Sequence, residues 1–274
     1  PITDNCPGFG SVAKYIAVST MEASYDVASM CKTSTKVFVL EVMGRHAGWI
    51  AAAGAMASTE DHEIPIVVLF PEVKFNQKKF LKAVNDKVKQ FGYCSVVVSE
   101  GVAWPDGRFL AETGLKDAFG HSQLGGAAPV VAEMIQEKLG HKYHWAVADY
   151  LQRAARHIAS KSDVEQAYAT GKAAVEYAIK GHNSVMPAIK RTSNKPYRWK
   201  IEMAPLKRVA NVEKMMPKSF ISKDGFGITK RCRDYLEPLI RGEEYPAYNK
   251  NGLPKYVQLK KVMVAKKCPD FKMK

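Results

Sequence analysis

The stretch Lys36–Gly48, KVFVLEVMGRHAG, decides the fold of this chain. Its first part, Val37–Val42, is short, apolar and rich in β-branched residues, which is typical of a strand buried on both faces of a sheet. The small-residue segment Ala47–Ala57 follows at once and predicts a helix packed closely on that sheet. Gly44 and Arg45 would then lie where a parallel strand ends and a helix begins, which is where open α/β sheets bind ligands.

The junction that follows this strand predicts a site for an anion. Free backbone N–H groups at the start of a helix favour negative charge, and the guanidinium of Arg45 can donate two parallel hydrogen bonds to a phosphate. The stretch therefore predicts a binding site for a phosphorylated small molecule. A second interpretation stays open at this point, in which Arg45 forms a structural ion pair with Glu41 of the preceding strand.

Strands and helices alternate along the rest of the chain. A second buried strand is expected at Ile64–Phe70, and further strands at Cys94–Ser99 and His144–Ala148. Helices are expected at Ser11–Met30, Asn76–Phe91, Pro129–Leu139 and Asp163–Ile179. Asp163 is expected to cap the last of these helices, and Gly181 to end it. The alternation predicts an α/β fold, a three-layer sandwich with a mainly parallel sheet.

Other segments carry weaker patterns. Gly8 and Gly10, ahead of the first helix, are compatible with a phosphate-cradling loop or with a plain start of that helix. The segment Gly114–Ala127 is expected to be rich in loops, and Val185–Lys190 to form a short strand. Beyond Arg191, prolines and basic residues predict short elements and long loops.

Length and charge limit the classes of protein that this chain can belong to. It has 274 residues, enough for one large domain or two small ones. No apolar run approaches the roughly 20 residues that span a bilayer, so no membrane association is expected. The net charge of +14 is compatible with nucleic acid, an anionic surface or phosphorylated substrates. Because the charge is spread along the chain and no nucleic-acid-binding motif accompanies it, no nucleic-acid partner is expected.

The cysteines indicate a reducing compartment. Five of them are scattered along the chain, at positions 6, 31, 94, 232 and 268. They form neither a CxxC pair nor a cluster with histidines, which argues against a disulfide framework. The chain also starts without a charged segment followed by an apolar one, as a secretion signal would have. A cytoplasmic location is therefore expected.

Polar side chains follow three of the predicted strands at the point where each strand ends. Arg45 follows the first strand, Glu100 follows the third, and Tyr150 and Arg153 follow the fourth. Because the carboxyl ends of parallel strands share one edge of a sheet, these side chains are expected to converge. Two arginines suit a phosphate, and a carboxylate accepts hydrogen bonds from hydroxyls, so the group predicts a sugar-phosphate site. Taken singly, Glu100 could instead be a solvated loop carboxylate, Tyr150 an aromatic at the edge of the core, and Arg153 a surface charge on a basic helix.

The segment VLEVMGRHAGWIA resembles part of the phosphofructokinase family, in which the Met-Gly-Arg triplet binds fructose 6-phosphate. The resemblance implies that role for Met43, Gly44 and Arg45. It extends to VVVSEG, whose Glu100 matches the family's sugar-binding glutamate, and it covers roughly residues 1–190. It also extends to a run of four expected substrate-binding residues, Tyr150, Leu151, Gln152 and Arg153.

The sequence is most similar to the diphosphate-dependent branch of that family. ATP-dependent members have a histidine where this chain has Tyr150, and two glycines where it has Ala154 and Ala155. The opening residues PITDNCPGFGSVAKYIAVST also resemble the diphosphate-dependent branch. The resemblance implies phosphoryl transfer from diphosphate to the 1-hydroxyl of fructose 6-phosphate, which gives fructose 1,6-bisphosphate in glycolysis.

Two further positions relate to contacts between subunits in the family. Lys36 falls where family members have a basic residue that reaches the phosphate site of a neighbouring subunit, so the resemblance implies a homo-oligomer. His144 falls where many members have another phosphate-binding arginine, and its role here stays open.

The family's catalytic loop, Thr-[Ile/Val]-Asp-Asn-Asp, and its glycine-rich donor loops do not occur in the sequence. Asp4 superficially resembles part of that loop, but Cys6 and Pro7 follow where the second aspartate should stand, so Asp4 is not expected to be the base. The resemblance implies that the base and the Mg²⁺ ligands lie upstream of Pro1. No catalytic residue and no metal ligand is therefore expected in this chain, which alone is expected to be inactive.

The resemblance also divides the chain into three parts. Residues 1–35 would end the donor-binding domain, and residues 36–160 would form the fructose 6-phosphate-binding domain. Residues 161–274 would return to the first domain, incomplete here, and end in a basic tail. Returning segments such as Asp163–Lys190 are expected to expose apolar surface.

Two other functions stay open on the sequence alone. One is an ATP-dependent 6-phosphofructokinase, because the residues that select the phosphoryl donor lie outside this chain. The other is a non-catalytic module that binds a sugar phosphate, because the base is absent from the sequence.

Overall fold

A four-stranded parallel sheet organises the computed structural model, which describes residues 3–116, 122–124 and 126–269. The strands are β1 (Val37–Val42), β2 (Ile66–Leu69), β3 (Cys94–Ser99) and β6 (Tyr143–Val147). Their order across the sheet is β2-β3-β1-β6, and each pairing is parallel. The predicted α/β fold with a mainly parallel sheet is confirmed.

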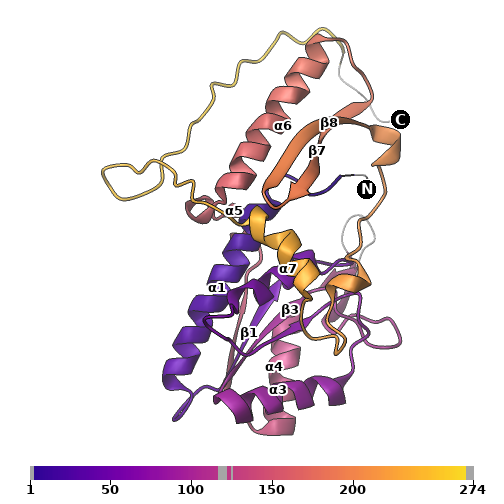
Figure 1. The fold of residues 1–274 in the computed structure, drawn as a ribbon. Helices are drawn as coiled ribbons and strands as arrows, with labels where there is room; N and C mark the ends of the chain where they lie inside the picture. Colours follow the sequence, from indigo (N-terminus) through magenta and orange to yellow (C-terminus); the bar gives the residue numbers. More distant parts are fainter. Residues whose placement is uncertain (1–2, 117–121, 125, 270–274) are drawn as a thin grey trace.

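Helices cover both faces of this sheet (Figure 1). They are α1 (Phe9–Met30) and α2 (Trp49–Gly54) on one face, and α3 (Gln77–Phe91) and α4 (Ala127–Leu139) on the other. Each helix returns the chain to the starting edge of the sheet, which is what a parallel arrangement requires. The result is the three-layer sandwich that the sequence predicts.

Strand β1 lies inside the sheet and contributes to both cores. Val37 and Val39 belong to the core under α3 and α4, whereas Leu40 and Val42 belong to the core under α1 and α2. Alternate residues of a strand point to opposite faces, so a short run of large apolar residues can fill two cores at once. Helix α2 packs so closely on the sheet that a Cβ on Gly54 would lie only 2.7 Å from the Val97 side chain.

The predicted bounds agree with the structure to within two residues at the ends of these strands and helices. The largest local difference is α2, which begins at Trp49 rather than at Ala47 and ends in a 3₁₀ turn at Ala55–Ala57. Gly48 precedes the helix, and its backbone N–H donates to both carboxylate oxygens of Glu72, at 3.0 and 3.1 Å. The loop before α2 is thus tied to the end of the neighbouring strand β2.

A second part of the chain packs beyond the sheet (Figure 1). It consists of α6 (Lys161–Ile179) and an antiparallel hairpin of β7 (Val185–Asn194) and β8 (Tyr197–Pro205). The prediction of only a short strand at 185–190 followed by loops is wrong here. In β8, exposed Arg198 and Lys200 alternate with more buried apolar residues, which is the two-residue period of a strand. The prolines and basic residues of this region had indicated loops instead.

Helix α6 exposes large apolar side chains. Tyr168, Val175 and Ile179 are 76%, 60% and 80% exposed. The expectation that returning segments expose apolar surface is confirmed for this helix.

The start of α1 depends on Asp163, in a role that differs from the predicted one. Asp163 lies inside the first turn of α6, whose N-cap is Ser160. Its carboxylate accepts hydrogen bonds from the backbone N–H groups of Gly8 (2.8 Å) and Ser11 (3.0 Å) and from the Ser11 hydroxyl (2.6 Å). A carboxylate of the chain itself thus takes the place that an anion would need, and the glycines before α1 form a plain helix start.

The remaining elements are short. They are β4 (Glu112–Lys116), β5 (Ser122–Leu124), α5 (Leu151–Ala154), α7 (Lys230–Leu236) and 3₁₀ turns at Arg156–Ile158, Leu206–Arg208, Lys218–Phe220 and Glu237–Leu239. Strands β4 and β5 pair within the segment that was expected to be rich in loops, of which residues 117–121 and 125 lie outside the described residues.

Helix α1 shares a core with the sheet, since Ile16 packs with Leu40 and Val42 of β1. The division of the chain into three functional parts stays a prediction. Among the described residues, no helix is both long and apolar enough to cross a membrane. All five cysteines are free thiols, and burial raises the pKa of Cys94 and of Cys232 to about 12.

Candidate functional site

The carboxyl ends of three adjacent strands form one continuous edge. Strand β1 pairs with β3 on one side and with β6 on the other, with Val42 opposite Ser99 and Glu41 opposite Val147. The segments that follow these strands, which contain Met43–Arg45, Glu100 and Tyr150–Arg153, are therefore neighbours. The convergence expected from the sequence follows from this strand order.

Side chains from both neighbouring strands hold the loop after β1. The Gly44 N–H donates to Oε1 of Glu100 at 3.1 Å, and the Met43 N–H donates to Oε1 of Gln152 at 3.3 Å. The Gln152 amide in turn donates to the carbonyl of Asp149 at 2.8 Å, and Gln152 is only 2% exposed. Two strand ends thus fix the backbone of the Met-Gly-Arg triplet through direct hydrogen bonds.

Two glycines allow this close approach. Gly44 adopts a φ of +146°, and a Cβ there would lie 2.6 Å from Oγ of Ser99. Gly101 lies against the other side of the triplet, where a Cβ would lie 1.8 Å from the carbonyl oxygen of Arg45. No side chain fits at that distance, so Gly101 sets how closely the ends of β1 and β3 approach each other.

The two arginines of the site have no competing ion pair among the described residues. Arg45 is half-buried after β1, and Arg153 is exposed on α5 with its guanidinium carbon 4.3 Å from the centre of the Tyr150 ring. The alternative of an ion pair between Arg45 and Glu41 is wrong. Glu41 instead accepts a hydrogen bond from the Ala128 N–H (2.8 Å) at the start of α4.

A small cavity opens between the strand ends. It has a volume of about 190 Å³ and is lined by Glu41, Val42, Met43, Glu100, Gly126, Val147 and Asp149. Three of these residues carry carboxylates. Burial raises the pKa of the Glu41 carboxyl above its usual value, and the Ala128 N–H opposes that shift. The cavity therefore offers several acceptors for hydroxyl groups, while Arg45 and Arg153 lie on the segments that follow β1 and β6 and do not line it.

Two of the predicted residues do not join this group within one chain. Lys36 precedes β1, at the opposite end of the strand from Arg45, and its ammonium donates to the Cys31 carbonyl at 2.6 Å. His144 is exposed near the amino end of β6, opposite Phe38. Six strand residues span roughly 20 Å, so neither side chain reaches the site of its own chain. The expectation that Lys36 serves a neighbouring subunit stays a prediction.

Sequence reasoning missed Asp149. It lines the cavity, has a φ of +37°, and accepts the hydrogen bond from Gln152 that orients the amide. A positive φ is costly for a residue other than glycine, and aspartate tolerates it better than most. The signal was present, since an aspartate directly follows the last predicted strand at the edge where ligands bind.

Comparison of the sequence with protein-family models assigns the chain to a family. Residues 1–178 match the family model described as phosphofructokinase. The chain therefore belongs to the phosphofructokinase family, as the Met-Gly-Arg segment predicts.

Individual members of this family are highly similar to the chain. The chain is 68% identical over 267 residues to a pyrophosphate--fructose 6-phosphate 1-phosphotransferase of Methylococcus capsulatus, a match that covers 97% of this chain and 63% of that protein. It is 63% identical over 273 residues to the protein of the same name of Halomonas elongata, covering 100% of this chain and 65% of the relative. This chain thus spans less than two thirds of the length of either relative.

A solved structure shows the same fold at high similarity. The pyrophosphate-dependent phosphofructokinase from Nitrosospira multiformis superimposes with a TM-score of 0.90 at 66% sequence identity. The match covers 99% of this chain and 64% of that chain.

The close contact at Gly101 predicts a difference between two glycine-to-alanine substitutions. Gly101→Ala should destabilise the fold by about 2–4 kcal/mol, because the added Cβ must push the Arg45 carbonyl away. Gly171→Ala is the matched control: Gly171 lies within α6 with open space around it, and alanine there should stabilise the helix by up to about 1 kcal/mol. Urea unfolding followed by circular dichroism measures both values. Equal stability of the two variants would contradict the close approach of β1 and β3.

Proposed function

We propose that this chain provides the fructose 6-phosphate site of a diphosphate-dependent 6-phosphofructokinase. The observation that carries the proposal is the fixed Met-Gly-Arg triplet of Met43–Arg45, with Glu100 and Arg153 on the flanking strand ends. Relatives that carry the diphosphate-dependent activity in their names, at 68% and 63% identity, support the choice of donor over ATP. The reaction gives fructose 1,6-bisphosphate and serves glycolysis.

Arg45 and Arg153 bind the 6-phosphate in this proposal. Both guanidinium groups are free of ion pairs among the described residues, so neither must leave a carboxylate before it binds substrate. The Tyr150 ring beneath Arg153 restricts that side chain in advance. Hydrogen bonds between guanidinium and phosphate are charge-assisted and frequently bidentate, which fixes both the position and the orientation of the phosphate.

The remaining predicted residues position the sugar. One oxygen of Glu100 holds the Gly44 N–H, and the other is available to a sugar hydroxyl. Met43 and Gly44 form the floor of the site, and the exposed Tyr150 and Leu151 border it. Gln152 is buried with both ends of its amide engaged, so we assign it a positioning role through Met43 rather than a substrate contact.

Phosphoryl transfer depends mostly on positioning the reactants and neutralising charge. In this reaction, the described residues would hold fructose 6-phosphate so that its 1-hydroxyl faces the phosphoryl donor. Among residues 3–116, 122–124 and 126–269 there is no group of three or more His, Cys, Asp or Glu side chains that could hold a metal ion. Mg²⁺ would neutralise charge on the diphosphate in such a reaction, and we assign none of its ligands to these residues.

Assembly into a homo-oligomer is part of the proposal. The edge strand β6 and the turn after it expose four large apolar side chains, Trp145, Val147, Tyr150 and Leu151, at 46%, 40%, 62% and 66%. A second subunit on this edge would cover that surface. The five free cysteines support a location in the reducing cytoplasm.

Substitution of Arg45 tests the site. In the intact protein, Arg45→Ala should weaken fructose 6-phosphate binding by about 10- to 100-fold, because a charge-assisted phosphate contact contributes roughly 1.5–3 kcal/mol. Isothermal titration calorimetry measures the affinity. Arg241→Ala is the control, since that arginine only pairs with Glu237 on the surface, and its affinity should equal the wild type. Unchanged affinity in Arg45→Ala would show that Arg45 does not bind the phosphate, which would contradict the proposed site.

The choice of donor is tested by a direct comparison. The intact protein should phosphorylate fructose 6-phosphate with diphosphate at a kcat/KM that exceeds the value with ATP by more than about tenfold. Product formation coupled to a fructose 1,6-bisphosphate assay measures both rates. A preference for ATP would support the ATP-dependent alternative, and no turnover with either donor would support a non-catalytic binding module.

A further inference from the structure

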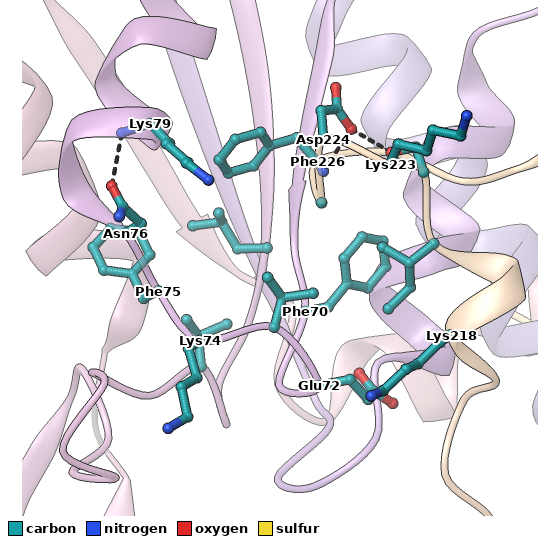
Figure 2. A pocket seen from close by; sticks show the side chains of 16 residues that line it. Phe70, Glu72, Lys74, Phe75, Asn76, Lys79, Lys218, Lys223, Asp224 and Phe226 are labelled. Atoms are coloured by element: carbon teal, nitrogen blue, oxygen red, sulfur yellow. Dashed lines mark hydrogen bonds between the residues drawn. The ribbon is translucent and has the colours of Figure 1, made fainter.

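A second cavity lies outside the sugar-phosphate site. It has a volume of about 620 Å³ and opens at the end of β2, between the start of α3 and the segment Lys218–Phe226 (Figure 2). Cavities of roughly 300–1,000 Å³ are typical of small-molecule sites. The sugar-phosphate site lies at the ends of β1, β3 and β6, and the two cavities share no lining residue.

The floor of this cavity is apolar and built into the core. Phe70 and Phe75, which are 1% and 3% exposed, contribute aromatic rings, and the buried Val102 also belongs to the lining. Phe226 closes the opposite side, and its carbonyl accepts a hydrogen bond from the Val68 N–H at 2.9 Å. This bond fixes the segment around Phe226 along the outer edge of β2, so the wall belongs to the folded sheet.

Four lysines surround this apolar floor: Lys74, Lys79, Lys218 and Lys223. Figure 2 shows the Lys79 ammonium directed toward the middle of the cavity, whereas the ammonium groups of Lys74 and Lys223 point outward from its margins. None of the four forms an ion pair with another described residue. With four lysines against the two carboxylates of Glu72 and Asp224, the lining carries a net positive charge.

The two carboxylates of the lining already have partners. Glu72 accepts hydrogen bonds from the backbone N–H groups of Gly48 and Met216, at 3.0–3.1 Å. Asp224 accepts from the Ser222 hydroxyl and from the Phe226 N–H. Both carboxylates are thus engaged by neutral donors of the surrounding loops and form no ion pair with the lysines, which leaves the ammonium groups available to an anion.

We propose that this cavity is a second binding site, for a small anion with a flat apolar body, such as an aromatic phosphate or carboxylate. The apolar body would lie on Phe70, Phe75 and Phe226, and the anionic group would meet the ammonium group of Lys79, with Lys223 on the opposite side of the rim. Burial of the apolar body supplies affinity, and the charge contacts set its orientation. An inorganic anion would lack the first contribution, and a neutral aromatic molecule would lack the second.

The probe for this site is 1-naphthyl phosphate, titrated into the intact protein by isothermal titration calorimetry. Binding with a Kd below about 1 mM is expected for a ligand of this size. Inorganic phosphate and 1-naphthol should each bind at least about tenfold more weakly, since each lacks one of the two contributions.

Two double variants with equal loss of charge distinguish this cavity from general attraction to a basic protein. Lys79→Gln with Lys223→Gln should weaken binding of 1-naphthyl phosphate by at least about tenfold. The control variant, Lys78→Gln with Lys230→Gln, removes two exposed lysines that do not line the cavity, one of them directly before Lys79 in the sequence. This variant should bind 1-naphthyl phosphate with an unchanged Kd. Circular dichroism of both variants checks that these surface changes preserve the fold.

Three outcomes would overturn the proposal. The first is no binding of 1-naphthyl phosphate by the wild type at millimolar concentration. The second is equal weakening in both double variants, which would indicate unspecific charge attraction. The third is loss of binding in Arg45→Ala with no change in the Lys79 and Lys223 variant, which would place the ligand at the sugar-phosphate site. A failure of the fructose 6-phosphate proposal would leave these results unaffected.

Discussion

Two hydrogen bonds, from the backbone N–H groups of Met43 and Gly44 to the side chains of Gln152 and Glu100, hold the site together. They join the end of the inner strand β1 to the ends of both neighbours, so that three segments distant in sequence act as one surface. The bonds require that the backbones approach closely, and Gly101 permits this because a Cβ there would overlap the Arg45 carbonyl oxygen. The shape of the edge therefore depends on a glycine and an amide that need not touch the ligand themselves.

Several carboxylates near the site accept hydrogen bonds from backbone N–H groups and form no ion pair with the arginines. Glu41 lies one residue from the end of β1, yet its carboxylate serves the start of α4 rather than Arg45. Asp163 similarly serves the start of α1, which leaves no room there for a bound anion. Because these carboxylates are committed to backbone N–H groups, the guanidinium groups of Arg45 and Arg153 stay free for phosphate. The lysines around the second cavity are free for the same reason, since Glu72 and Asp224 bind backbone donors.

Much of the fold and the membership of the site could be predicted, because both follow from local sequence. Buried strands such as Cys94–Ser99 are continuous apolar runs, and parallel strands place their following residues on one edge. The partners of Asp163 and Glu41 could not be predicted, because each lies more than 80 residues away in the sequence. Strand β8 was missed because the prolines and basic residues beyond Arg191 indicated loops, although Arg198 and Lys200 alternate with apolar residues. The position of Asp149 directly after a predicted strand was visible in the sequence, but its backbone conformation was not.

A crystal structure of the intact protein with fructose 6-phosphate would show directly whether this edge binds the sugar phosphate. The 6-phosphate is expected within hydrogen-bond distance of the guanidinium groups of Arg45 and Arg153, with a sugar hydroxyl in contact with Glu100 and the Met43 and Gly44 hydrogen bonds intact. Gln152 is expected to make no contact with the sugar. Fructose 6-phosphate bound elsewhere, for example among the lysines around Phe226, or bound at this edge with both arginines turned away, would contradict the proposed site.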